Sequence, residues 1–195
     1  TRKESSAASD VYKRQDMGVT FADDTIPGVD LIMPDPGFII DKKDDLLGIV
    51  LTHAHEDHIG AVAHIWPELK CKLYATPFTA ALLTEKFKEK KIDISSFLKI
   101  VPLNSQIKLG AFEIDFVTLT HSILEPNGLS IKTPLGTILH TGDWKIDPNP
   151  LIGNKIDEEK LKKIGNSGVS TMICDSTNIF SPGRAGSESL SLIHI

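Results

Sequence analysis

The chain has 195 residues, of which 41% are hydrophobic and 24% charged, and its formal net charge is −5. This balance favours one globular domain with a sizeable core, and it excludes a disordered chain, a fibre or a protein that binds polyanions by bulk positive charge. No apolar run approaches the length of a membrane span, and no secretory signal is visible. Cys71 and Cys174 are unclustered and lie in apolar runs, which predicts buried, reduced thiols in a cytoplasmic protein.

The two ends of the chain are related through their coding DNA. Residues 10–15 can be encoded by GAT GTG TAT AAG AGA CAG, and the reverse complement of that string translates as residues 190–195. The string also resembles the end of a transposon-based sequencing adaptor. We therefore expect residues 1–15 and 190–195 to be translated adaptor, and residues 16–189 to be a piece of a longer gene product.

Between these ends, strand patterns alternate with helical ones. Apolar residues at helical spacing predict a short helix from Ile59 up to Pro67. Thr76-Pro77 predicts the start of a second helix that runs to about Lys91, and a charged third helix is predicted from Asp157 to Ile164. The second helix is expected to turn inward Phe78, Leu82, Leu83 and Phe87. The predicted strands are residues 47–51, 72–75, 97–101, 106–109, 112–119, 129–132, 136–140 and 169–174, the last of them buried. This order indicates a mixed α/β sandwich.

The most informative stretch is residues 53–58, with the pattern H-x-H-x-D-H, directly after the strand predicted at 47–51. Three histidines and an aspartate at this spacing are hard to explain by packing. In an extended backbone, His53 and His55 can point to one side and bind one metal ion. Asp57 and His58 follow where the chain turns into a helix and can face a second ion. Glu56 is expected to point outward.

Two later strand ends carry further candidate ligands. His121 ends a long alternating strand, and Asp143 follows Gly142, which turns another strand. A carboxylate can bridge two cations and a neutral imidazole cannot, so Asp143 suits a bridging position. Alone, each residue is typical of a polar strand end or a turn, but with residues 53–58 they complete a two-metal set. His64 and His140 are predicted to be structural.

These motifs together resemble a known enzyme superfamily. Asp16-x-Gly18, the segment 53–58, His121 and Asp143 are similar to the successive metal motifs of the metallo-β-lactamase superfamily, in the same order. Residues 24–35, 141–147 and the D-S-T-N segment 175–178 resemble bacterial ribonuclease J, a family of β-CASP nucleases. The resemblance implies an αββα sandwich truncated at both ends. It also implies a partial metallo-β-lactamase domain at 16–174 and the start of a β-CASP domain at 175–189.

The resemblance further implies a chemistry, hydrolysis of RNA phosphodiester bonds by a two-metal mechanism. His53, His55 and His121 would hold one zinc ion, Asp57 and His58 a second, and Asp143 would bridge them. Asp57 and His58 would thereby take part in catalysis, and Asp16 would orient a ligand histidine. Asp175 would support a catalytic histidine of the β-CASP insert. The parent protein is expected to act on RNA as a homo-oligomer away from membranes, with endo- or exonuclease action left open.

Several alternatives stay open. The family pattern continues past Ser189 with further histidines, one of them a ligand of the second metal site, so we expect this piece to be incomplete and nearly inactive. A hydrolase of small esters or thioesters is the competing enzyme class, although the D-S-T-N segment argues against it. An inert truncated metal-binding fragment is the non-enzyme alternative. A di-iron redox relative is disfavoured, because a glutamate would be expected where His55 stands.

The lysine run near the end of the second predicted helix also has two interpretations. The run consists of Lys86, Lys88, Lys90 and Lys91. A solvated face is favoured, since cations suit the negative end of the helix macrodipole. A patch that contacts the RNA backbone is the alternative.

Overall fold

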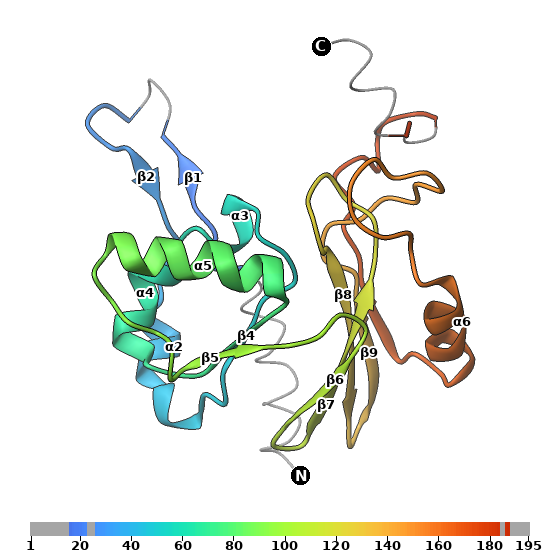
Figure 1. Cartoon of the computed structure of the whole chain (residues 1–195), viewed down its shortest axis with the longest axis horizontal. Coiled ribbons are helices and arrows are strands. Elements are labelled where there is room, and N and C mark those ends of the chain that lie inside the picture. Colours follow the sequence, from blue (N-terminus) through green and yellow to red (C-terminus); the bar gives the residue numbers. More distant parts are fainter. Residues whose placement is uncertain (1–15, 23–25, 184–185, 188–195) are drawn as a thin grey trace. The chain divides into compact units, whose positions relative to one another are not determined.

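The computed structural model describes residues 16–22, 26–183 and 186–187. The predicted adaptor segments 1–15 and 190–195, residues 188–189 and residues 24–25 of the ribonuclease-like stretch lie outside this range. The chain divides into two compact units, Thr1–Ile100 and Val101–Ile195, and each combines helices with a sheet, as the predicted α/β class requires (Figure 1). In the described part of the chain, no helix has the length and apolar character needed to span a bilayer.

Unit 1 is built on a small parallel sheet with the strand order β3-β4-β5. Its strands are β3 (Ile49–Val50), β4 (Leu73–Ala75) and β5 (Leu98–Ile100). Parallel strands need crossover connections, which helices supply here. The crossovers contain α3 (Glu56–Ile59), α4 (Val62–Leu69) and α5 (Pro77–Glu89), and α5 contacts both β4 and β5 (Figure 1). Ahead of the sheet come the antiparallel pair β1 (Thr20–Phe21) and β2 (Leu31–Ile32), the helix α2 (Gly37–Asp41) and a 3-10 turn at Lys43–Asp45.

Helix α5 supplies much of the core of unit 1. It begins as predicted, with Thr76 at the N-cap and Pro77 in the first turn. Phe87 is fully buried, and its ring centroid lies 5.4 Å from that of Trp66 in an edge-to-face contact. The predicted stripe was partly wrong, because Leu82 is 38% exposed. The buried stripe consists of Thr79, Ala80, Leu83 and Phe87, which recur at helical spacing.

Helix α4 runs past the residue predicted to end it. Pro67 lies inside the helix, which continues to Leu69. Proline is tolerated best in the first turn of a helix, whereas Pro67 lies in the last turn and removes one helical hydrogen bond. Burial of Trp66 and Leu69 offsets that loss, and Lys70 then closes the helix in the left-handed conformation with φ 48°.

Unit 2 contains a five-stranded sheet with the order β10-β9-β8-β7-β6. Its strands are β6 (Gln106–Leu109), β7 (Phe112–Thr118), β8 (Asn127–Thr133), β9 (Gly136–His140) and β10 (Thr171–Ile173). Strands β6 to β9 are joined as antiparallel neighbours, including the predicted hairpin β8–β9, whereas β10 pairs parallel to β9. The parallel pair is connected through α6 (Glu158–Asn166), close to the predicted third helix.

Helix α6 packs on the sheet through a small apolar cluster. Ile164 is buried with Val117 and Leu119 of the β7 segment, and Leu161 packs against them. The side chain of Asp157 caps the helix by accepting a hydrogen bond from the Lys160 N–H at 2.9 Å. The Lys160 ammonium donates to the carbonyls of Asn104 and Phe116, which fastens the first turn to the sheet.

The predictions for the last strand and for the cysteines need correction. Strand β10 is an edge strand within the described sheet, and Met172 is 51% exposed instead of buried. Cys174, directly after β10, is exposed as well, and Cys71 is half-buried. Burial raises the pKa of the Cys71 thiol to about 11, so this cysteine stays protonated at neutral pH.

Candidate metal centre

The first half of the candidate centre lies in unit 1, where the chain leaves β3. His53 is fully buried, and His55 immediately precedes α3 with an extended backbone. The ring centroid of His53 lies 4.9 Å from that of His55 and 4.2 Å from that of His58. The predicted strand end therefore brings three imidazoles together. Neutral imidazoles that crowd in this way can share a cation.

Asp57 and His58 occupy α3, as the turn into a helix predicted. The Nε2 atom of His58 lies 3.5 Å from Oδ2 of Asp57. At the other side of the ring, Nδ1 lies 2.7 Å from Oδ1 of Asp16, a residue far away in sequence. A carboxylate on one ring nitrogen fixes the tautomer and directs the other nitrogen, here Nε2, toward the Asp57 side.

The backbone next to Asp16 holds α3 in place. The Met17 N–H donates to the His58 carbonyl at 3.1 Å, and the Val19 N–H donates to the Glu56 carbonyl at 2.9 Å. Gly18, between them, presses directly on the helix. A Cβ atom at Gly18 would lie 1.7 Å from the carbonyl oxygen of Asp57, so only glycine fits. The D-x-G motif thus supplies both a carboxylate and a close backbone approach.

Glu56 points outward, as predicted, and finds a partner there. Its carboxylate accepts hydrogen bonds from the Lys86 ammonium of α5 at 2.5 and 2.7 Å. The ligand segment is thus tied to α5 as well as to the N-terminal segment.

The second half of the candidate centre lies in unit 2. His121 follows Thr120, which forms an isolated antiparallel bridge with Lys145. Asp143 follows β9 through Gly142, whose φ of 57° lies in the left-handed region. These two strand ends bring Nε2 of His121 to 3.6 Å from Oδ2 of Asp143. An imidazole and a carboxylate at this distance can bind one metal ion.

Asp175 lies beside the Asp143 loop because β9 and β10 are parallel neighbours, so their carboxyl ends share one edge of the sheet. Its carboxylate accepts hydrogen bonds from the Thr177 N–H at 2.9 Å and the Thr177 hydroxyl at 2.7 Å. Burial is the largest influence on the pKa of Asp175 and raises it. Hydrogen bonds from Thr177 and the Trp144 N–H, with the charge of His121, outweigh burial and leave the pKa below its usual value. Asp175 is therefore a carboxylate that orders the D-S-T-N turn.

The two other histidines of the described residues, His64 and His140, have different surroundings. Nδ1 of His64, on α4, lies 3.2 Å from the Lys90 ammonium. Burial first, then the charges of Lys90 and Lys86, lowers the pKa of His64. In unit 2, Nδ1 of His140 accepts a hydrogen bond from the Gly142 N–H at 3.0 Å. These contacts agree with the structural roles predicted for His64 and His140.

The donor atoms fit a metal ion that prefers nitrogen with some oxygen. Unit 1 offers the pairs His53–His55 and Asp57–His58, and unit 2 offers His121–Asp143, with ligand atoms within 4.8 Å of one another in each pair. Imidazole with carboxylate suits zinc and similar transition ions, whereas magnesium and calcium prefer all-oxygen sites. The chain therefore carries a histidine–aspartate set able to hold metal.

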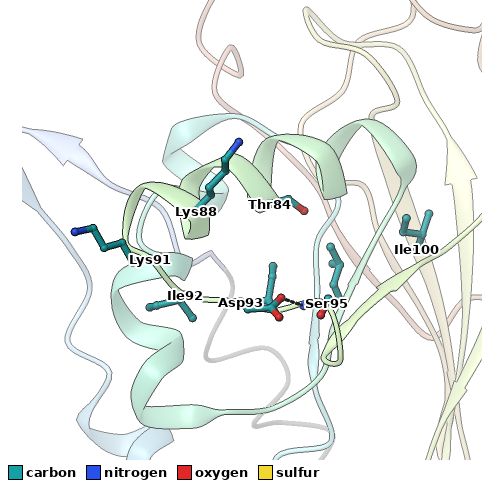
Figure 2. A pocket seen from close by; sticks show the side chains of 9 residues that line it. Thr84, Lys88, Lys91, Ile92, Asp93, Ser95 and Ile100 are labelled. Carbon is teal, nitrogen blue, oxygen red and sulfur yellow. Dashed lines mark hydrogen bonds between the residues drawn. The ribbon is translucent and has the colours of Figure 1, made fainter.

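A pocket in unit 1 is separate from these ligands. It has a volume of about 570 Å³ and lies where α5 ends and β5 begins. Its lining includes Thr84, Lys88 and Ile100, and Figure 2 shows the hydrogen bond between Asp93 and Ser95 at its base. Its lining contains none of the predicted ligands, so the pocket is not part of the candidate centre.

Two supporting contacts were missed by sequence reasoning. The contact of Gly18 with Asp57 and the ion pair of Lys86 with Glu56 both join distant parts of the chain. The glycine of the D-x-G motif was a visible signal, although nothing local indicated its contact with α3. No local signal marks Lys86 among its neighbouring lysines.

Comparison with known proteins extends this description. Residues 24–162 match the family model described as "Beta-lactamase superfamily domain". The chain is 44% identical over 175 residues to ribonuclease J of Sinorhizobium meliloti, and the aligned stretch covers 89% of this chain and 31% of that protein. It is 41% identical over 175 residues to ribonuclease J of Helicobacter pylori, with 89% and 25% covered. For ribonuclease J of Thermus thermophilus, the identity is 37% over 180 residues, with 89% and 31% covered.

Among solved structures, the chain resembles a protein of unknown function from Enterococcus faecalis V583. The TM-score is 0.55 at 20% identity, with 92% of this chain and 49% of that chain covered. At this identity the likeness concerns the fold alone. The chain spans about a third or less of the length of the three ribonuclease J relatives.

Proposed function

Because this chain belongs to the beta-lactamase superfamily, we propose that it is part of a metal-dependent ribonuclease that hydrolyses RNA phosphodiester bonds. The observation that carries the proposal is the set of three clustered imidazoles in unit 1, with Asp16 and Asp57 on either side of His58. The similarity to a segment of ribonuclease J supports RNA as the substrate.

The proposed ligand assignment uses both halves of the centre. His53, His55 and His121 would hold one zinc ion, Asp57 and His58 would hold a second, and Asp143 would bridge the two. The motif order along the chain and the donor chemistry within each unit support this assignment. When bound, the ions act as Lewis acids that lower the pKa of water and stabilise negative charge on a phosphate.

The chain's own residues prepare the site. Asp16 accepts a hydrogen bond from the Nδ1–H of His58 and thereby keeps Nε2 available as a ligand atom. The buried position of His53 excludes water from one side of the imidazole cluster. The Thr52 hydroxyl lies 3.0 Å from Nδ1 of His53 and fixes its ring.

Further parts of the proposal concern the parent protein. Residues 16–174 form its metallo-β-lactamase domain, and residues 175–189 begin a β-CASP domain. Asp175 supports a catalytic histidine there, and its lowered pKa favours the charged form that such a role needs. The parent acts in the cytoplasm as a homo-oligomer.

The decisive experiment compares the gene-length parent with its His55→Ala variant. We expect the parent to cleave a 5′-labelled single-stranded RNA and to bind about two zinc ions per chain. His55→Ala should lower the rate by at least about 100-fold and weaken zinc binding, because one imidazole is lost. His64→Ala is the matched control, since His64 contacts Lys90 of the α5 end, and it should retain zinc.

Two outcomes would contradict the proposal. Hydrolysis of nitrophenyl esters by the parent without RNA cleavage would favour the small-ester hydrolase. A parent that contains no zinc or other transition metal by elemental analysis would exclude the metal centre.

A further inference from the structure

The four lysines that close α5 fall into different environments. Lys86 pairs with Glu56, Lys88 pairs with Glu85 on the same helix, and Lys90 contacts His64. Lys91 lines the pocket at the end of α5. Most of these cations already have a partner within unit 1. Each lysine has to be explained separately.

Lys86 has the most specific contact of the four. Its ammonium reaches both oxygens of one carboxylate, and its side chain is only 25% exposed. The partner, Glu56, is the first residue of α3 and the direct neighbour of Asp57. Lys86 is thus the link between a long core helix and the short helix that carries two proposed ligands.

Helix α3 needs such a link. It has four residues, and a helix this short is unstable by itself, because nucleation costs more than one turn of hydrogen bonds returns. Its N-cap residue, His55, makes no side-chain capping bond. The helix therefore takes its conformation from its surroundings. The segment 16–19 contacts one side of it, and Lys86 holds Glu56 on another.

We propose that Lys86, through its ion pair with Glu56, is a positioning residue that fixes α3 and so aligns Asp57 and His58 for metal binding. The metal-binding part of this inference rests on the proposed function. The ion pair is partly exposed, so it contributes little to global stability. Its effect is therefore local: the ion pair orders the segment that carries the candidate ligands.

The test compares Lys86→Met with Lys88→Met in the 195-residue chain. Hydrogen–deuterium exchange is measured for the amides of His58, Ile59 and Gly60, which donate to carbonyls of α3 and its N-cap. In Lys86→Met these amides should exchange at least about threefold faster, while the exchange rates of β4 and α5 stay unchanged. In Lys88→Met all of these exchange rates should stay unchanged. Faster exchange throughout unit 1 would mean a general structural role and would overturn the proposal.

Cobalt affinity, followed by visible absorption, is the second measurement. Lys86→Met should weaken cobalt binding by about tenfold, as loss of a group that orients ligands does. The double variant Lys86→Glu/Glu56→Lys restores opposite charges and should recover most of the affinity and the slow exchange. Unchanged affinity in Lys86→Met would overturn the proposal.

The positioning role of Lys86 and the metal centre itself can fail separately. If the unsubstituted chain binds no cobalt, the metal centre of the proposed function fails in this chain. The exchange measurement then still decides whether Lys86 positions α3. If the amides of α3 exchange equally fast with and without Lys86, the positioning role is wrong, whatever the chain binds.

Discussion

The candidate ligands of the two units are held in opposite ways. In unit 1 the candidate ligands are close in sequence, and distant residues hold them, with Asp16 on His58 and Lys86 on Glu56. In unit 2 the candidate ligands His121 and Asp143 are distant in sequence, and the strand ends of a regular sheet bring them together. A compact motif therefore needs outside support, whereas a dispersed pair can depend on sheet register.

This difference decides where each half is vulnerable. The unit 1 half should fail when packing against α3 is disturbed, because the four-residue helix has little stability of its own. The unit 2 half should fail when a hydrogen bond between the strand ends is lost. Substitutions away from these supports should have smaller effects on metal binding.

The largest effect is expected from Gly18→Ala. The added methyl group would lie 1.7 Å from the Asp57 carbonyl, so the N-terminal segment or α3 has to move. We expect a loss of about 3 kcal/mol in the free energy of unfolding, near the upper end for overpacking, and a clear loss of zinc affinity. Urea denaturation and zinc competition titration measure the two.

Gly165→Ala in α6 is the matched control. A Cβ at Gly165 would meet nothing within 4 Å, and the residue lies in a helix. The same substitution should therefore stabilise the chain by about 0.5 kcal/mol and leave zinc affinity unchanged. Equal effects of the two substitutions would contradict the close packing of Gly18 on α3.

A smaller effect is expected from Thr120→Val in unit 2. The Thr120 hydroxyl donates to the Lys145 carbonyl and accepts from the Asp147 N–H, which joins the segments that carry His121 and Asp143. Removal of the hydroxyl should cost about 2 kcal/mol and weaken zinc binding, because a buried N–H and a partly buried carbonyl lose a partner. Urea denaturation and zinc titration again provide the readout.

Thr118→Val tests this interpretation two residues earlier. Thr118 is as buried as Thr120, at 2% exposed, but its hydroxyl has no hydrogen-bond partner among the described residues. Its replacement should be neutral or stabilising by up to about 1 kcal/mol. If Thr118→Val destabilised the chain as much as Thr120→Val, shape and not the hydrogen bond would explain both.

The part of the centre that was predictable from sequence is the part with short spacing. The segment 53–58 follows a strand, and strand ends place side chains predictably, so the clustering of its histidines was foreseen. The elements α5 and α6 were also foreseen, because Thr76-Pro77 and Asp157 are local start signals.

What sequence could not predict depends on tertiary contacts. Leu82 was placed inward and is exposed, since helical periodicity gives the spacing of a stripe but not which face meets the sheet. Pro67 was expected to end helix α4, but the helix continues to Leu69 because apolar residues on both sides of Pro67 are buried. That Asp16 orients a ligand histidine was expected only from the family resemblance, and the ion pair of Lys86 was not expected at all, because the spacing of these residues carries no signal of its own.

The smallest effect is expected from Asp157→Ala, which sharpens the contrast between the two kinds of support. Helix α6 is capped locally by Asp157, whereas α3 has no side-chain cap and depends on distant residues. Loss of the cap should lower the free energy of unfolding by about 1 kcal/mol, measured as a lower urea midpoint with unchanged slope. Asp157→Ser, which keeps a capping oxygen, should recover most of that loss.

Zinc affinity should stay the same in both variants, because α6 contributes no proposed ligand and its cap stabilises only its own first turn. A parallel loss of zinc affinity would mean that disorder of α6 spreads through unit 2 to His121 and Asp143. The candidate ligands of unit 2 would then depend on distant packing as much as those of unit 1 do.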